Sequence, residues 1–103
     1  MGFWNLKTLR LGEFRPGIFS KVENGSTLTM AFMEIAPHKE GSAHSHPFDQ
    51  CGVVVDGEIE MSVGEEKKLL RSMETYFIPA GITHNWRTAR SPAKILDVVS
   101  KQG

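Results

Sequence analysis

Three histidines and one glutamine in this sequence have the types and the spacing of a metal site. His44 and His46 lie two residues apart in GSAHSHPFDQ, so on a β-strand both side chains point to the same face. Gln50 keeps that parity four residues later, and His84 follows the turn residues Pro79-Ala80-Gly81. Imidazoles grouped in this way, with one further side chain in reach, suit a divalent transition metal.

Each of these residues also has an ordinary alternative. A single histidine is usually a core or surface residue, and Gln50 could merely form a hydrogen bond inside the protein. Asp49 is the alternative fourth ligand, although its parity points away from the histidines unless a bulge intervenes. We expect the ion to be held by His44, His46, Gln50 and His84, with zinc, nickel, manganese and iron as the candidate metals.

The length and the charge of the chain exclude several classes of protein. Its 103 residues make one domain, and 12 basic and 12 acidic residues give a formal net charge of zero. A neutral chain without a basic run argues against binding to nucleic acid, and no apolar stretch has the length of a transmembrane helix. The N-terminus lacks the order of a secretory signal, and Cys51 is the single cysteine. We therefore expect a cytoplasmic protein without an internal disulfide.

Apolar residues and turn residues alternate along the chain in a pattern that predicts short strands and no helix. We expect strands over Phe19–Val22, Leu28–Ile35, 44–46, Cys51–Val55, Glu58–Val63, Leu69–Arg71, Thr75–Ile78, His84–Arg87 and Lys94–Val99. Asp56-Gly57 has the composition of a tight hairpin turn. Short strands of this kind predict a small barrel or sandwich. The stretch Phe3–Leu11 is expected to be a further edge strand or an arm that is swapped with a partner chain.

The first histidine segment resembles the first motif of the cupin family, which reads G-x5-H-x-H-x(3,4)-E-x6-G. His44 and His46 take the two histidine positions, Gln50 stands in place of the glutamate, and Gly57 takes the last glycine position. Gly41 is two residues closer to His44 than the motif has it.

The second histidine segment resembles the second cupin motif, G-x5-P-x-G-x2-H-x3-N. The residues from Pro79 to His84 match its centre, whereas Met73 and Thr88 replace its first glycine and its last asparagine. The resemblance implies an all-β fold, a jelly-roll-like antiparallel β-barrel with a metal inside. Residues 1–103 would then be a single cupin domain, with the barrel over about 28–99 and an N-terminal arm over 1–20.

Within the cupins, the HSHPFDQ segment resembles small single-domain pectin-degradation proteins that act on unsaturated uronates. In that group the glutamine is a metal ligand, and the last strand reads D-x-F-x-P-x-x-R. Here Asp97 matches the aspartate, Val99 replaces the phenylalanine, and the arginine is missing. The resemblance therefore implies the same fold and metal, while the substrate can differ.

Asp97 is the candidate catalytic residue. It lies between Ile95 and Val99 on one face of an apolar strand, where a buried carboxylate needs a partner. Asp97 is therefore either an acid in the cavity or an edge residue. A proton shuttle beside a metal needs such an acid. The candidate pocket residues, with core packing as the alternative for most of them, are Trp86, Phe32, Met30, Met61 and Val99.

These residues favour an enzyme that acts on a small anionic metabolite, either a sugar acid or a keto or hydroxy acid, by ring opening, tautomerisation or isomerisation. A non-catalytic module that binds a metal or small ligand, and a metal-dependent dioxygenase, are the alternatives. We also expect a homodimer, because small barrels have exposed edges. The apolar N-terminal arm that would cover a partner carries Phe3, Trp4, Leu6, Leu9 and Leu11.

Overall fold

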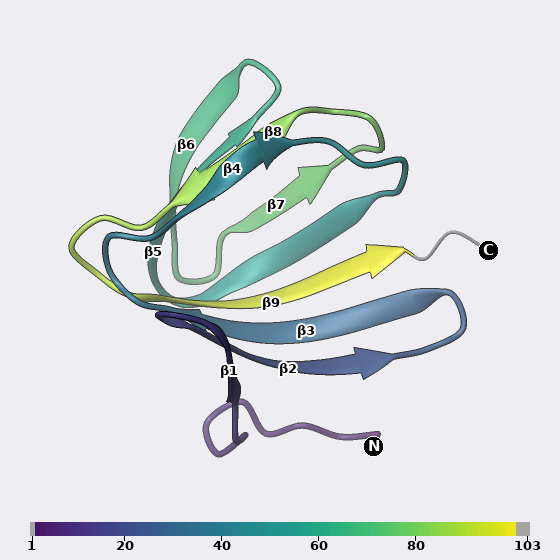
Figure 1. The fold of residues 1–103 in the computed structure, drawn as a ribbon, viewed down its shortest axis with the longest axis vertical. Helices are drawn as coiled ribbons and strands as arrows, with labels where there is room; N and C mark the ends of the chain where they lie inside the picture. Colours follow the sequence, from purple (N-terminus) through teal and green to yellow (C-terminus); the bar gives the residue numbers. More distant parts are fainter. Residues whose placement is uncertain (1, 101–103) are drawn as a thin grey trace.

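The computed structural model describes residues 2–100, and every regular element in that part of the chain is a β-strand (Figure 1). The strands are β1 (Gly12–Arg15), β2 (Ile18–Asn24), β3 (Leu28–Ile35), β4 (Glu40–His44), β5 (Gln50–Val63), β6 (Glu66–Arg71), β7 (Thr75–Ile78), β8 (His84–Arg87) and β9 (Ala93–Ser100). The predicted all-β class is thereby confirmed. Within residues 2–100, no helix is long and apolar enough to span a membrane.

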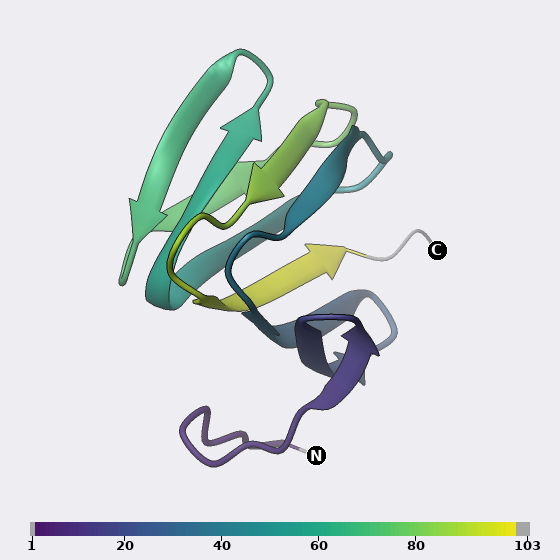
Figure 2. The same ribbon diagram turned by 60° about the vertical axis from the view of Figure 1, so that its left-hand side comes forward.

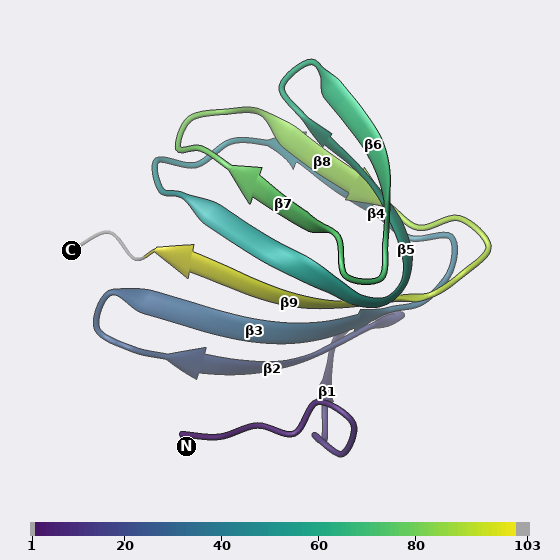
Figure 3. The same ribbon diagram turned by 180° about the vertical axis from the view of Figure 1, so that it is seen from behind.

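All strand pairs are antiparallel, and together they form a sheet that curls into two facing layers (Figures 1 and 2). One layer has the order β1-β2-β3-β9-β5-β7, and the other has the order β4-β8-β5-β6. The long strand β5 belongs to both layers, because its first part pairs with β9 and β7 and its last part with β8 and β6. Seen from behind, β7 lies between β5 and β8 (Figure 3). The architecture agrees with the predicted jelly-roll-like barrel.

The predicted hairpin at Asp56-Gly57 is wrong, since β5 runs through this dipeptide without a turn. Gly57 has a φ of 82°, and a side chain there would collide with the carbonyl oxygen of Pro92. The register between β5 and β9 also shifts between Val54 and Asp56. The glycine therefore allows a bend at which β5 passes from one layer to the other.

The core lies between the two layers and consists of the inward-facing residues of the strands. On β9, Ala93, Ile95 and Asp97 alternate with less buried residues, as expected for a strand with one face on the core. The buried hydrophobic core cluster comprises Ile18, Ile35, Val54, Ile59, Met61, Leu70, Tyr76, Ile78, Ala93 and Ile95.

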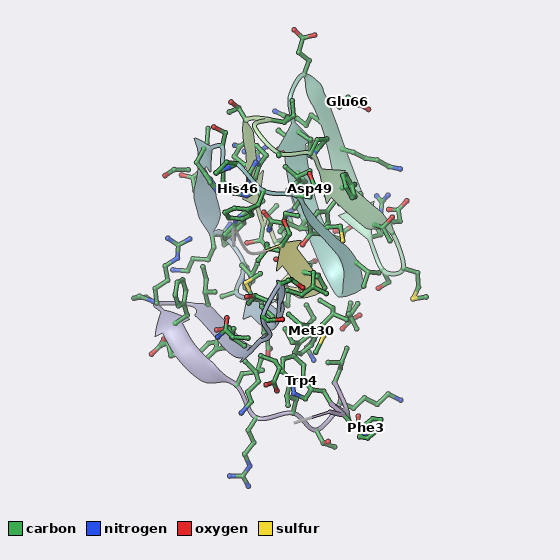
Figure 4. The ribbon with its side chains drawn as sticks, turned by 90° about the vertical axis from the view of Figure 1, so that its right-hand side faces the viewer. Phe3, Trp4, Met30, His46, Asp49 and Glu66 are labelled. Carbon is green, nitrogen blue, oxygen red and sulfur yellow. The ribbon has the colours of Figure 1, made fainter. Side chains whose placement is uncertain are left out.

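The N-terminal arm is shorter than expected and packs in part on its own chain. The sheet begins at Gly12, so only residues 2–11 lie outside it. Leu9 and Leu11 line a hollow together with Phe19 and Phe32, on the outer side of β2 and β3. Phe3 remains 96% exposed, and Figure 4 shows Phe3 and Trp4 far from His46 and Asp49.

Candidate metal centre

The three histidines come together at one end of the curled sheet. His44 ends β4, His84 begins β8, and the two residues are partners in the antiparallel register. His46 follows in the loop to β5, where its ring stacks on that of Phe48 at a centroid distance of 4.1 Å. One nitrogen from each of His44, His46 and His84 lies within 4.8 Å of the others.

Two loops are tied to each other and thereby hold His46 opposite His84. The amide of Gly81 donates to the carbonyl of His46 at 2.8 Å. The amide of Ala80 donates to Oδ1 of Asp49 at 2.9 Å. Asp49 therefore caps the turn that precedes His84. It does not belong to the group of side chains that could hold a metal ion, which consists of His44, His46 and His84.

The hydrogen bonds of the three imidazoles fix which nitrogen is free to bind a metal. Each Nδ1 lies 2.9 Å from a backbone carbonyl: that of Ser42 for His44, that of Phe48 for His46 and that of Ile82 for His84. A carbonyl oxygen can only accept, so each Nδ1 carries the proton. In the neutral imidazoles, each Nε2 then has a free lone pair.

Two of these lone pairs indicate that a cation fits between the side chains. Nε2 of His84 is buried and has no hydrogen-bond partner among the described residues, and His84 as a whole is only 4% exposed. Nε2 of His46 faces Oε1 of Gln50 at 2.9 Å, although neither atom has a proton to donate when the imidazole is neutral. A divalent ion bound by both atoms would remove this conflict, since neighbouring ligands about 2.1 Å from one ion lie about 3.0 Å apart in octahedral and about 3.4 Å apart in tetrahedral coordination.

Gln50 lies between His46 and the buried carboxylate of Asp97. Its Nε2 donates to Oδ1 of Asp97 at 2.9 Å, and the phenol of Tyr76 donates to the same oxygen. Asp97 is 5% exposed. Burial raises the pKa of the Asp97 carboxyl, and the hydrogen bonds from Tyr76 and Gln50 oppose part of that rise. Burial and the charge of Asp97 raise the pKa of Tyr76 far above its ordinary value, so the phenol keeps its proton.

Comparison with known protein families shows to which family this chain belongs. The cupin domain family matches residues 31–99, which is more than half of the chain. The chain belongs to the cupin family. The sequence resemblance to cupins is thereby confirmed.

Individual proteins resemble this cupin in sequence or in fold. It is 29% identical to H2HPP isomerase of Bacillus subtilis over 83 residues, which are 78% of this chain and 34% of that protein. The chain thus spans about a third of the length of that relative. Among solved structures, KdgF from Halomonas sp. has a TM-score of 0.87 at 22% identity, over 100% of this chain and 96% of the other. TT1209 from Thermus thermophilus has a TM-score of 0.85 at 27% identity, over 100% of both chains.

A small cavity of about 80 Å³ adjoins His44 and His84 of this cupin. Of the predicted pocket residues, Met61 and Trp86 line it. Val99 is the partner of Gln50 in the register of β5 and β9 and is not among the lining residues. The cavity is lined by Met33, Ile35, His44, Gln50, Met61, Tyr76, Ile78, His84, Asn85, Trp86 and Ile95.

Two predicted pocket residues lie on the wrong face of β3. Met33 and Ile35 line the cavity, so the alternate residues Met30 and Phe32 belong to the outer face of the sheet. Phe32 lines the hollow beneath the N-terminal arm. Both faces of β3 are apolar, and alternation alone therefore could not show which face is the inner one.

Tyr76 and the glycines that make room around the site were not predicted from the sequence. A side chain at Gly41 would meet Nε1 of Trp86 at 2.5 Å, and one at Gly52 would collide with the phenol of Tyr76. Tyr76 shares its parity with the buried Ile78 on β7, and this was the one sequence signal for an inward-facing phenol. Its partner Asp97 is distant in sequence, and only the pairing of β7 and β9 with β5 brings the two together.

Proposed function

We propose that this cupin is a metal-dependent enzyme that moves a proton on a small acid, by ring opening, tautomerisation or isomerisation. The observation that carries the proposal is the position of Asp97. It is a buried carboxylate bonded to Gln50, and Gln50 in turn faces His46 in the histidine cluster. A proton acceptor one side chain away from a metal site is the minimum that such chemistry needs.

The ion would be held by Nε2 of His44, His46 and His84 and by Oε1 of Gln50. When bound, a divalent ion such as zinc, nickel, manganese or iron would polarise a carbonyl or hydroxyl group of the substrate. None of these four side chains is a carboxylate, so the charge of the ion stays available for an anionic oxygen ligand. The site therefore favours a carboxylate, an enolate or a hydroxy acid.

Asp97 would take up and return the proton. Its Oδ1 already accepts from both Gln50 and Tyr76, so the proton would go on and off Oδ2. Because burial raises the pKa of Asp97, the carboxyl is better matched to proton transfer near neutral pH than an exposed aspartate is.

The relatives support an isomerase-like reaction, and they leave the substrate open. One relative is by name an isomerase, and the sequence resembles cupins that act on unsaturated uronates. Asp97 is shared with those cupins, whereas Val99 and the missing arginine differ. Unsaturated uronates are therefore the first substrates to test, followed by other sugar acids and by keto acids.

A non-catalytic module that binds a metal or a small ligand is the second candidate. It is favoured by one observation, that Asp97 lies behind Gln50 and Tyr76 and is not among the residues lining the cavity. In that case the metal-loaded protein would bind small acids without converting them.

The proposal is tested with the metal-loaded protein and its Asp97→Asn variant. We expect turnover of at least one acid of the panel by the wild type, and a loss of about 10²–10⁴-fold in the variant, because positioned proton transfer contributes that factor. Metal content should be unchanged. Asp56→Asn, which removes an exposed carboxylate on β5 outside the site, is the matched control and should keep its activity. Turnover by Asp97→Asn at the wild-type rate would show that Asp97 is structural, and binding without turnover by the wild type would favour the second candidate.

A further inference from the structure

Tyr76, Asp97 and Gln50 form a continuous row of side chains from β7 to the histidine cluster. The Tyr76 phenol and Gln50 Nε2 both donate to Oδ1 of Asp97. The other end of the Gln50 amide, Oε1, faces Nε2 of His46 at 2.9 Å. Tyr76 is thus connected to Gln50, the candidate metal ligand, through two hydrogen bonds that meet at Asp97.

The amide of Gln50 has two ends, and only one of them can bind a metal. Oε1 has lone pairs for a cation, whereas the NH₂ group has only protons to offer. The end that faces the histidines is decided by the group at the other end. Asp97 Oδ1 is an acceptor, so it takes the NH₂ group and leaves Oε1 toward His46.

The phenol of Tyr76 fixes the position of that acceptor. Within the sheet, Gly52 is the register partner of both Tyr76 and Asp97. A side chain at Gly52 would collide with the Tyr76 phenol and would lie 2.7 Å from the carbonyl oxygen of Leu96. Because Gly52 has no side chain, the Tyr76 phenol can extend across it to the carboxylate of Asp97.

From these contacts we propose that Tyr76 is a positioning residue for the metal site: by holding Oδ1 of Asp97, it keeps the amide oxygen of Gln50 directed at the ion. This role rests on the proposed function of Gln50 as a ligand. Without the phenol, Asp97 keeps a single hydrogen bond at Oδ1 and gains rotational freedom. Gln50 then loses its fixed acceptor, and the ligand oxygen is less well oriented. Groups that orient metal ligands through hydrogen bonds typically contribute about 10–100-fold to metal affinity.

The test is a titration of chelator-stripped protein with Co²⁺, followed by calorimetry and by the visible absorption of the bound ion. We expect Tyr76→Phe, which deletes only the phenol oxygen, to bind Co²⁺ about 10–100-fold more weakly than the wild type. Phe77→Leu is the matched control, because Phe77 is the neighbouring aromatic residue on β7 and is 60% exposed. It should bind Co²⁺ as the wild type does.

A double-mutant cycle separates positioning from a general effect on the fold. In a Gln50→Ala background the residue through which Tyr76 acts is gone, so adding Tyr76→Phe should change Co²⁺ affinity by less than about threefold. The same loss in both backgrounds would overturn the proposal, as would wild-type affinity and an unchanged visible spectrum in Tyr76→Phe.

A second variant covers the case in which Tyr76→Phe does not fold. Asp97→Leu breaks the row at its middle and leaves Tyr76 and Gln50 in place. It should lower Co²⁺ affinity to a similar extent, and wild-type affinity in this variant would contradict the role of Tyr76. A wild-type protein that binds no Co²⁺ would overturn both the metal site and this inference. Normal wild-type binding with an unaffected Tyr76→Phe would overturn the inference alone.

Discussion

The phenol of Tyr76 donates a hydrogen bond to Asp97 across Gly52, which is the register partner of both residues in the sheet. A buried carboxylate without partners is costly, and this contact, with the one from Gln50, supplies two donors to Asp97. The same contact joins β7 to β9 through side chains, although β5 lies between these two strands in the sheet and pairs with each of them. The position of the proposed acid–base residue is therefore set by a glycine on a third strand.

Met73→Gly should stabilise the protein. Met73 has a φ of 72° and is 82% exposed, so it occupies a left-handed position at the place where the second cupin motif has glycine. A non-glycine residue there costs about 1–3 kcal/mol, and the greater freedom of glycine in the unfolded chain offsets about 0.4–1 kcal/mol. We expect the free energy of unfolding in urea to rise by about 1 kcal/mol, within the range of roughly 0–2.6 kcal/mol that these two effects leave. Met73→Ala keeps the strained backbone and should gain nothing; equal stability of the Gly and Ala variants would argue against strain at this turn.

The metal-free protein should lose stability as the pH falls below about 6.5, the ordinary pKa of histidine. Burial lowers the pKa of His84 in the folded state. Below the ordinary pKa of histidine, the imidazole of residue 84 therefore binds a proton more readily in the unfolded chain than in the folded chain. As a result, the free energy of unfolding rises with pH through this window. Urea unfolding between pH 5 and 8, in chelator, measures the slope. His84→Gln should have a smaller slope than the wild type, and the exposed His38→Gln should keep it. A slope that is equal in all three proteins would exclude His84 as its source.

We expect a homodimer that uses the outer face of the sheet. Register pairs join Met30, Val98, Cys51 and Phe77 into one apolar row across β3, β9, β5 and β7, and Phe77 is 60% exposed. Burying such a row against a second copy is favourable. Light scattering at micromolar concentration should give twice the chain mass, and Phe77→Glu with Val98→Glu should give the chain mass. Met73→Glu, on an exposed turn, is the control. A folded wild-type monomer at that concentration would contradict the expectation.

The sequence was sufficient to predict the all-β class and the grouping of the histidines, because both depend on local signals. The alternation of His44 and His46 predicted that they lie together, although the structure places His46 in the loop after β4 and not on a strand over 44–46. The turn before His84 is recognisable from proline and glycine. Asp56-Gly57 was misread because the same dipeptide serves a hairpin and a bend. Only the contact of Gly57 with Pro92, a residue distant in sequence, distinguishes the two.

The residues that were misplaced or missed depend on pairing between distant strands. Met30 and Phe32 could not be separated from the inner residues of β3, because both faces of that strand carry apolar side chains. Tyr76 could be placed beside Asp97 only once β7 and β9 were known to flank Gly52. The sequence offers Asp49 as an alternative ligand, whereas in the structure its Oδ1 accepts a hydrogen bond from the distant amide of Ala80.

Metal content is the measurement that tests the account most directly. Protein purified without chelators should contain a divalent transition metal, up to one ion per chain, and the His44→Ala/His46→Ala double variant should contain none after the same treatment. His38→Ala is the matched control, because this exposed histidine lies outside the cluster, and it should keep the wild-type content. Equal metal content in the wild type and the double variant, or a wild type that takes up no metal when it is offered zinc, nickel, manganese and iron, would contradict the assignment of the site.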